Sequence, residues 1–361
     1  MFYRCLPLLT GLTVACAPYL LLAQQHEQLQ SVTKPNIVIL LADDLGWGDV
    51  GYHNSNVVTP NIDTIARNGV AFDRFYVNPT CSPTRASLLT GQFSTTHGVN
   101  GPIQWHSKQG LPLEWPTLPG FLKQSGYQTH LVGKWHLGST PGLLPSQRGF
   151  ERTVALADSG ADNWEQRPYI PLYDKARWYA DGEPYQLPED FYSSRFLVDK
   201  TIEFIDRHIE DTRPFFAYLP FQAVHIPVQA PQAFTDSYMG TYDAGWHAIR
   251  AARQRRAATL GVIPPDVEMV GMPTTGDWQA LDADQQRYEA KRMAVYAGMV
   301  EAMDHHIGRL VSYLKSQAQL DNTIFIFTSD NGAEASGPAD PRTFLNRQQT
   351  RSLGYNTDYE T

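Results

Sequence analysis

Short, unbroken runs of apolar residues alternate along this chain with segments in which apolar residues recur every three or four positions. The runs at 36–42 (NIVILLA), 215–219 (FFAYL) and 323–329 (TIFIFTS) carry no charge, which is typical of strands buried on both faces of a sheet. Two other segments, 192–210 and 285–317, have helical spacing and predict helices with one apolar face.

Weaker patterns predict further elements between these. Helices are expected after Pro60, after Cys81 and over 118–124, and strands over 71–77 and 127–132. Two segments rich in Pro, Gly, Trp and Tyr, 137–190 and 231–284, are predicted to be long ordered excursions that shape a pocket. Strands that alternate with helices imply an α/β layered fold with a largely parallel sheet.

Polar and charged side chains follow several of the predicted strands where each strand ends. They are Asp43 and Asp44, Lys134 and His136, His225, and Asp330 with Asn331. Because ligands in such folds collect beyond the carboxyl ends of the strands, we expect these side chains to form one site. Their carboxylate and amide oxygens suit Ca²⁺ or Mg²⁺ far better than Zn²⁺. Turn carboxylates and helix caps are the alternative interpretation.

The N-terminal residues 1–23 are predicted to be a secretory signal peptide. A single charge, Arg4, precedes a mostly apolar run that ends in small and polar residues. A membrane anchor is one alternative, although Pro7 and Pro18 interrupt the ~20 apolar residues that a span needs. Lipid attachment at Cys16 is another, with an imperfect lipobox. We expect an exported protein, periplasmic or secreted, with no stable membrane span.

Composition narrows the classes of partner and leaves one cysteine to explain. The 361 residues are 42% hydrophobic, enough for a large core, and the net charge of −8 argues against nucleic acid as a partner. Cys5 and Cys16 lie in the predicted signal peptide, so Cys81 has no disulfide partner. An unpaired cysteine in an oxidising compartment is a liability unless it is buried or used.

Cys81 begins the stretch CSPTRASLLTG, which predicts a helix N-terminus. Ser82 can cap the helix and Pro83 is favoured at its first position. Free N–H groups and the helix dipole attract an anion there, and Arg85 could return toward residue 81 to bind a tetrahedral oxyanion. This predicts an activated group at position 81 facing a sulfate or phosphate ester. The alternatives are a low-pKa thiol beside an arginine, or a merely buried cysteine.

The same stretch resembles the type I sulfatase signature, C-x-P-x-R with its extended tail. Four more motifs are similar to those of the family and occur in its order: ADDLGWGD at 42–49, GKWHLG at 133–138, QRGFE at 147–151 and SDNGAE at 329–334. Residues 34–361 are therefore expected to form a sulfatase catalytic domain, and the stretches 241–264 and 295–310 resemble the bacterial arylsulfatase branch. The resemblance implies an alkaline-phosphatase-like α/β sandwich, with a central, largely parallel mixed sheet flanked by helices.

Carried over position by position, the resemblance also implies a metal site and a catalytic set. Ca²⁺, with Mg²⁺ as the second choice, would be bound by Asp43, Asp44, Asp330, Asn331 and the modified Cys81. In the family this cysteine is oxidised to formylglycine, whose hydrate is the nucleophile, so a formylglycine-generating maturation enzyme is an expected partner. Arg85 would hold the hydrate, Lys134 would bind sulfate, His136 would position the geminal diol, and His225 would lie near the leaving oxygen.

The implied activity is that of an arylsulfatase-type sulfuric ester hydrolase acting on a small-molecule or saccharide sulfate ester. Attack at sulfur would give a sulfoenzyme intermediate, which the second hydroxyl of the hydrate resolves after His136 removes its proton. A phosphonate monoester or phosphodiester hydrolase of the same superfamily is the alternative. His305 and His306, in the long predicted helix, are expected to be structural or solvent-facing.

The resemblance fails in one region. Family members usually supply a second sulfate-binding lysine downstream of the D-N-G motif, but after Asp330 this chain offers Arg342, Arg347 and Arg351 and no lysine. The family's small C-terminal subdomain, an antiparallel sheet with a helix, is also missing. We therefore expect a C-terminally truncated chain, for which an inactive remnant is a further alternative.

Overall fold

The computed structural model describes residues 34–53, 55–72, 74–169, 174–207, 209, 211–269 and 276–333. The predicted signal peptide, the lipid site at Cys16, and Arg342, Arg347 and Arg351 lie outside the described residues. Within the described ranges, no helix combines the length and the apolar character needed to cross a bilayer.

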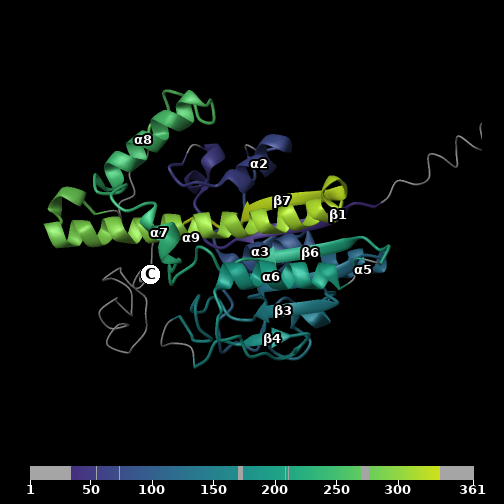
Figure 1. Ribbon diagram of the computed structural model, residues 1–361. Coiled ribbons are helices and arrows are strands. Elements are labelled where there is room, and N and C mark those ends of the chain that lie inside the picture. The colour runs from purple at the N-terminus through teal and green to yellow at the C-terminus, as the bar shows by residue number, and fades with distance from the viewer. Residues whose placement is uncertain are drawn as a thin grey trace, which may run out of the picture. The chain divides into compact units, whose positions relative to one another are not determined.

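The described residues form a seven-stranded sheet with the order β5-β4-β3-β2-β6-β1-β7 (Figure 1). Its strands are β1 (Asn36–Ala42), β2 (Gln128–Lys134), β3 (Arg152–Leu156), β4 (Trp178–Ala180), β5 (Glu183–Pro184), β6 (Phe215–Pro220) and β7 (Thr323–Ser329). The strands from β3 to β7 in this order are mutually parallel, and β4 and β5 pair antiparallel at the other edge. The predicted α/β fold with a largely parallel mixed sheet is confirmed.

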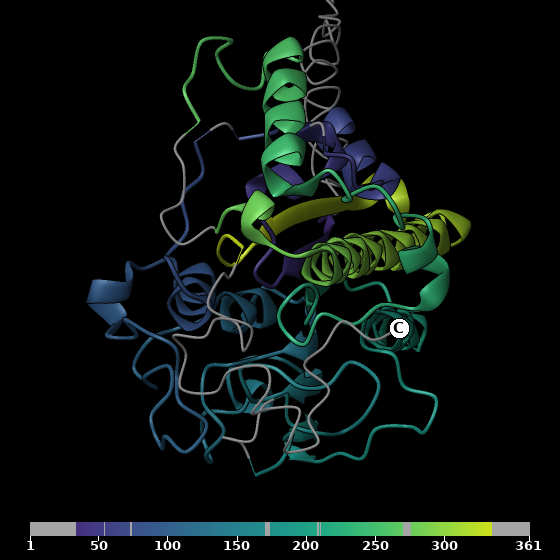
Figure 2. The same cartoon turned by 90° about the vertical axis from the view of Figure 1, so that its left-hand side faces the viewer.

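Helices cover both faces of the sheet along β1, as an unbroken apolar strand requires. The expected burial of 323–329 on both faces is wrong, because Ile324 and Ile326 of the edge strand β7 are 48% and 42% exposed. Along β1, Val38 and Leu40 pack in one core with α6 (Ser193–Asp206) and α9 (Ala283–Ser316). The alternate residues Ile39 and Leu41 pack in a second core with α3 (Cys81–Thr90) and α5 (Leu118–Gln124). Figure 2 shows α3 and α6 on either side of the strands. The period of two along a strand thus divides one apolar run between two cores.

The remaining elements connect or extend these layers. The other helices are α2 (Pro60–Asn68), α4 (Ser94–His97), α7 (Gln232–Asp236) and α8 (Gly245–Thr259), and short 3₁₀ turns are η1 (Trp47–Asp49), η2 (Gly51–His53), η3 (Pro145–Gln147), η4 (Trp278–Ala280) and η5 (Leu320–Asn322). The long helix α9 begins at a capping box, in which the Asp282 side chain accepts from the Gln285 N–H and the Gln285 side chain accepts from the Asp282 N–H.

The structure corrects the secondary structure in two places. The strand expected over 71–77 is wrong: its described residues contain no strand, and the side chains of Phe72 and Tyr76 are largely exposed. A strand needs a neighbour for its ladder, and the described part of the chain offers none there. The excursion over 137–190 is more regular than expected, because it contributes β3, β4 and β5.

Candidate active site

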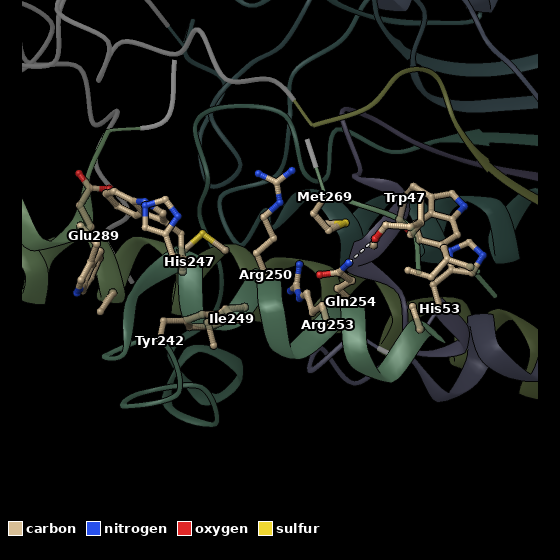
Figure 3. A pocket seen from close by; sticks show the side chains of 18 residues that line it. Trp47, His53, Tyr242, His247, Ile249, Arg250, Arg253, Gln254, Met269 and Glu289 are labelled. Atoms are coloured by element: carbon tan, nitrogen blue, oxygen red, sulfur yellow. Dashed lines mark hydrogen bonds between the residues drawn. The ribbon is translucent and has the colours of Figure 1, made fainter. Parts of the chain in front are cut away.

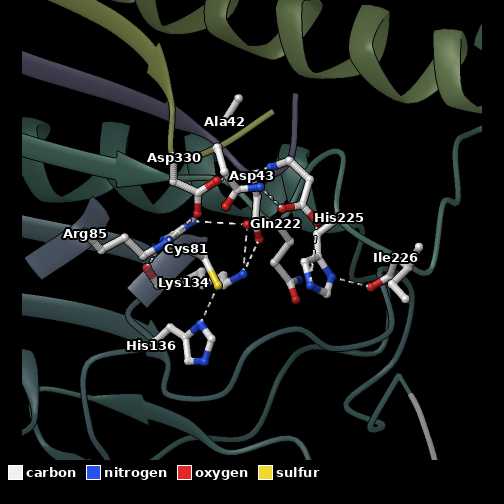
Figure 4. A network of polar contacts seen from close by, with 12 residues as sticks. Ala42, Asp43, Cys81, Arg85, Lys134, His136, Gln222, His225, Ile226 and Asp330 are labelled. Atoms are coloured by element: carbon white, nitrogen blue, oxygen red, sulfur yellow. Dashed lines mark hydrogen bonds and ion pairs between the residues drawn. The ribbon is translucent and has the colours of Figure 1, made fainter. Parts of the chain in front are cut away.

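Neighbouring strands end at one edge of the sheet and bring the predicted side chains together (Figure 4). The parallel register pairs Ala42 of β1 with Ser329 of β7, so the next residues, Asp43 and Asp330, lie at the same level. The Asp330 N–H donates to the Ala42 carbonyl at 3.1 Å. Lys134 is the last residue of β2, which lies two positions from β1 in the same sheet.

Three buried carboxylates meet at this edge. Oxygens of Asp43, Asp44 and Asp330 all lie within 4.8 Å of one another. The backbone N–H of Asp44 donates to Asp330 Oδ1 at 3.2 Å. Burial, and then the charge of Asp43, raise the pKa of Asp330, while Arg85 opposes the rise. Carboxylates crowded in this way favour a bound cation, because it relieves their mutual repulsion.

The side chain of Asn331 completes a set of oxygen donors that fits Ca²⁺. Its Nδ2 donates to Asp44 Oδ1 at 2.6 Å and to the Gly332 carbonyl at 2.9 Å. Its Oδ1 is buried and has no hydrogen-bond partner within the described residues. A buried, unpaired carbonyl oxygen beside three carboxylates is a ligand of the kind that Ca²⁺ takes. The fifth predicted ligand, Cys81, does not belong to the 4.8 Å cluster.

Two fully buried cations balance part of this negative charge. Lys134 Nζ donates to both carboxylate oxygens of Asp43, at 2.8 and 2.6 Å. Arg85 Nε and Nη2 lie 2.9 and 2.8 Å from Asp330 Oδ2, and Nη1 donates to the Lys134 carbonyl at 2.8 Å. Burial lowers the pKa of both side chains, but the adjacent carboxylates outweigh it and raise both values. The guanidinium predicted to return toward residue 81 is therefore held on Asp330.

Cys81 is the first residue of α3 and faces His136. Its Sγ lies 3.2 Å from His136 Nδ1, and His136 Nε2 lies 3.0 Å from the Ile103 carbonyl. Because a carbonyl only accepts, Nε2 carries the hydrogen and Nδ1 of the neutral ring accepts from the thiol. Burial, followed by the charges of Lys134 and Arg85, lowers the pKa of His136 well below its usual value. Burial raises the pKa of Cys81 to about 11, so a low-pKa thiol is not what this geometry supports.

In Figure 4 the His225 ring lies to the right of Cys81 and Lys134, and His225 and Cys81 line the same pocket. Its Nδ1 donates to the Ile226 carbonyl at 2.7 Å, and its Nε2 lies 3.8 Å from Asp44 Oδ2. The ring of Tyr169 meets it edge to face at 5.3 Å. All the predicted site residues are thus brought into one network.

A pocket of about 260 Å³ opens onto this network. Its lining includes predicted residues together with residues that the sequence did not single out, namely Pro102, Ile103, Gln104, Trp105, Ser159 and Tyr169. Ser159 and Tyr169 lie in one of the excursions expected to shape a pocket, and that prediction is confirmed. No comparable pattern pointed to residues 102–105.

Two site residues adopt the left-handed backbone conformation that favours glycine. Asp44 has φ of 61° and His136 has φ of 55°. Such conformations cost free energy for side chains other than glycine and cluster at functional sites, where the surroundings hold them in place. Here they aim one carboxylate and one imidazole into the pocket.

A second cavity, of about 550 Å³, lies between α8, α9 and η1 (Figure 3). It shares no lining residue with the first pocket, and most of its wall is apolar, including Trp47, Trp246, Trp278, Met269 and Met293. It lacks the buried carboxylates and cations of the strand ends, so we place the chemistry in the smaller pocket.

Fold and site together define an α/β protein with a buried centre of carboxylates and cations at the carboxyl ends of a parallel sheet. Residues 35–360 match the Sulfatase family. The chain is 38% identical over 328 residues to an uncharacterised sulfatase of Schizosaccharomyces pombe, covering 84% of this chain and 58% of that protein. It is 34% identical over 312 residues to an arylsulfatase of Klebsiella aerogenes, covering 83% and 66%. The chain belongs to the sulfatase family.

The structure agrees with this assignment. The crystal structure of Ps i-CgsB in complex with k-i-k-neocarrahexaose superposes with a TM-score of 0.63 at 28% identity, covering 83% of this chain and 59% of that one. The predicted alkaline-phosphatase-like fold is confirmed. The chain spans about three fifths to two thirds of the length of these three proteins.

Proposed function

We propose that this protein hydrolyses sulfate esters of the arylsulfatase type, with a formylglycine made from Cys81 and a bound Ca²⁺. The observation that carries the proposal is the position of Cys81. It lies at the N-terminus of α3, with His136 on its sulfur and two buried cations and three buried carboxylates adjacent. The larger cavity between α8 and α9 lacks this combination of charges.

The chain's own residues have distinct tasks in this proposal. Asp43, Asp44, Asp330 and Asn331 would hold Ca²⁺, which supplies positive charge for a bound oxyanion. Formylglycine, once formed at position 81, supplies a hydrate with two hydroxyls on one carbon, which serine or cysteine cannot offer.

The other side chains handle protons and the charge of the ester. His136 is neutral with Nδ1 directed at residue 81, so it can take a proton from a group there. Lys134 and Arg85 stay protonated and lend positive charge to the sulfate oxygens. His225 keeps its Nδ1 hydrogen on a carbonyl and presents Nε2 to the pocket, where it can assist the leaving oxygen.

The substrate and the location are part of the proposal. The Klebsiella relative is an arylsulfatase, and Ps i-CgsB was solved with k-i-k-neocarrahexaose. Both support a sulfate ester of a ring-bearing alcohol, aryl or saccharide. Export to the periplasm or beyond, and maturation by a formylglycine-generating enzyme, follow from the signal-like start and the C-x-P-x-R motif.

The mass of the peptide that contains residue 81 tests the modification directly. Co-expression with a formylglycine-generating enzyme should lower this mass by about 18 Da, because sulfur is replaced by oxygen and hydrogen is lost. Cys81→Ala is the matched control, since its peptide cannot be converted. A thiol that remains unmodified under these conditions would contradict the proposal.

Turnover tests the ester. The converted protein with Ca²⁺ should release nitrophenol from nitrophenyl sulfate faster than from the matched phosphodiester and phenylphosphonate monoester, and Cys81→Ala should release none. Faster reaction of the phosphorus esters would identify the superfamily alternative. A folded, converted protein that cleaves no ester would identify an inactive remnant.

A further inference from the structure

One wall of the active-site pocket is a loop that contributes Pro102, Ile103, Gln104 and Trp105. The loop lies outside every helix and strand, so its position depends on contacts with other segments. His136 provides one anchor, because its Nε2 donates to the Ile103 carbonyl at 3.0 Å. A second anchor holds the loop two residues further on.

The second anchor is Arg177, which precedes β4. Its Nη2 donates to the Trp105 carbonyl at 2.7 Å, and its Nη1 donates to Ser139 Oγ at 2.9 Å. Its Nε donates to Asp158 Oδ1 at 2.9 Å, and Nη2 pairs with the same carboxylate. Ser139 follows His136 in the loop after β2, and Asp158 follows β3. A single guanidinium therefore ties together three loops that surround the pocket.

Burial and several hydrogen bonds hold Arg177 and Asp158 in one fixed geometry. The Asp158 side chain is fully buried and that of Arg177 is 18% exposed. The Arg177 backbone N–H also donates to Asp158 Oδ2 at 2.8 Å, and its carbonyl accepts from the Ala157 N–H at 2.9 Å. Three side-chain nitrogens in a fixed plane serve three acceptor groups here, which the single ammonium of lysine cannot do.

Two aromatic rings, those of Trp105 and Tyr169, line this side of the pocket. Trp105 lies on the Arg177-anchored loop, Ser159 follows Asp158 directly, and Tyr169 contributes a second ring. Cys81 and His136 line the same pocket, so in the proposed function this wall lies beside the reacting ester, where it can contact the alcohol. Aromatic side chains pack on flat rings, whether of a phenol or on the apolar face of a sugar.

We propose that Trp105 is a specificity residue for the ring of the leaving alcohol, and that Arg177 is the positioning residue that fixes it. The inference rests on the proposed sulfatase function and extends it to the choice of substrate. Arg177 touches neither the metal ligands nor Cys81, Arg85 or Lys134 in any described hydrogen bond or ion pair, so sulfate binding and the chemical step should not depend on it directly.

Arg177→Lys and Trp105→Ala test this proposal, with Arg152→Lys as the matched control. Arg152 also pairs with an aspartate, Asp181, but at the opposite end of β3. Losing a charge-assisted hydrogen bond of the Arg177 guanidinium should raise KM for nitrophenyl sulfate and for a monosaccharide sulfate by about ten-fold or more. KM for a short alkyl sulfate and inhibition by inorganic sulfate should stay near wild type, because neither reaches the wall.

Comparing nitrophenyl sulfate with the monosaccharide sulfate shows whether the wall binds an aryl ring or a sugar ring. A loss for nitrophenyl sulfate alone assigns the wall to aryl esters, and a loss for the sugar sulfate alone assigns it to saccharides. Trp105→Phe should restore most of the affinity, since it keeps a ring. Equal losses for ring and alkyl sulfates, or a loss in Arg152→Lys as large as in Arg177→Lys, would overturn the proposal.

Hydrogen exchange gives a readout that needs no turnover. Peptides spanning residues 101–107 should exchange faster in Arg177→Lys than in wild type or Arg152→Lys, while peptides of β1 and β7 stay unchanged. Unaltered exchange in residues 101–107 would overturn the positioning role even in a protein without activity. Failure of the proposed function has a different signature, an unconverted Cys81 or no ester cleavage by wild type.

Discussion

The same substitution should have very different effects on stability at the two adjacent aspartates after β1. Asp43 accepts two hydrogen bonds from the buried Lys134 and lies 3.4 Å from Arg85. Asp44 has no ion pair with lysine or arginine in the described structure and receives a hydrogen bond from Asn331. Asp43→Asn therefore leaves the buried Lys134 without its carboxylate partner, whereas Asp44→Asn removes one of three crowded negative charges.

The magnitudes follow from this difference in partners. Breaking a buried ion pair by removing one member costs about 3–5 kcal/mol, which corresponds to roughly 5–15 °C in Tm for a domain of this size. Asp44→Asn should stay within about 1 kcal/mol of wild type in chelator, because asparagine can still accept the bond from Asn331. Added Ca²⁺ at about 100 times Kd should stabilise wild type by about 2.7 kcal/mol, and Asp44→Asn should lose most of that gain.

Thermal unfolding in chelator and in Ca²⁺ measures both effects, with the exposed Asp321→Asn as control. The expected pattern is a low Tm for Asp43→Asn in chelator, and a near-normal Tm for Asp44→Asn that no longer rises with Ca²⁺. Equal destabilisation of the two variants in chelator would refute the charge assignment. A full Ca²⁺ response in Asp44→Asn would refute its role as a ligand.

Two further predictions concern the stability of the fold without added metal. Gly133→Ala should lower the free energy of unfolding by more than about 3 kcal/mol, because the φ of Gly133 is +138° and an added Cβ would lie 1.9 Å from the Pro220 carbonyl oxygen. Thermal unfolding checks this, with Gly48→Ala as the control, because nothing lies within 4 Å of a Cβ added at Gly48. Equal Tm values for the two variants would contradict the prediction. Burial, His305, Arg309 and Arg195 lower the pKa of His306 to about 3. From pH 6.5 downward the unfolded chain binds a proton there that the folded chain does not, so stability falls by at most about 1.4 kcal/mol per pH unit. His306→Asn should reduce this slope in urea unfolding between pH 7 and pH 5, and an unchanged slope would count against it.

The strand ends could be predicted from the sequence because the signal is local. The apolar run of β7 ends at Asp330 and that of β1 ends at Asp43, and parallel strands must deliver such residues to the same edge. The stretch CSPTRASLLTG likewise predicted a helix N-terminus near Cys81, which α3 confirms. The expected cap is wrong, because the N-cap is Thr80, and the Ser82 hydroxyl donates to the His136 carbonyl at 2.9 Å instead. The position of each of these residues depends on a single strand or helix and on its direction.

Other features depend on segments that are distant in sequence, and no local pattern announces them. The stretch 71–77 is expected to be a strand, but a ladder requires a partner strand, and none is present in the described residues. Arg177 joins loops that precede it by 19, 38 and 72 positions, so only the tertiary structure reveals it. The fixing of Lys134 on Asp43 likewise required the sheet order, with β6 placed between β2 and β1.

The charge of the centre bears on which esters it can take. Three carboxylates and two cations, Arg85 and Lys134, sum to −1, while His136 and the Cys81 thiol are neutral. A divalent cation changes the sum to +1, so an anionic ester is attracted only to the metal-loaded site.

A sulfate monoester carries −1 and brings the buried centre to neutrality, as would a phosphodiester or a phosphonate monoester. A phosphate monoester carries close to −2 at neutral pH and leaves an uncompensated charge in a site where desolvation is costly. We therefore expect nitrophenyl phosphate to be the poorest of the four esters, and measured kcat/KM values in which it exceeds nitrophenyl sulfate would contradict this charge balance.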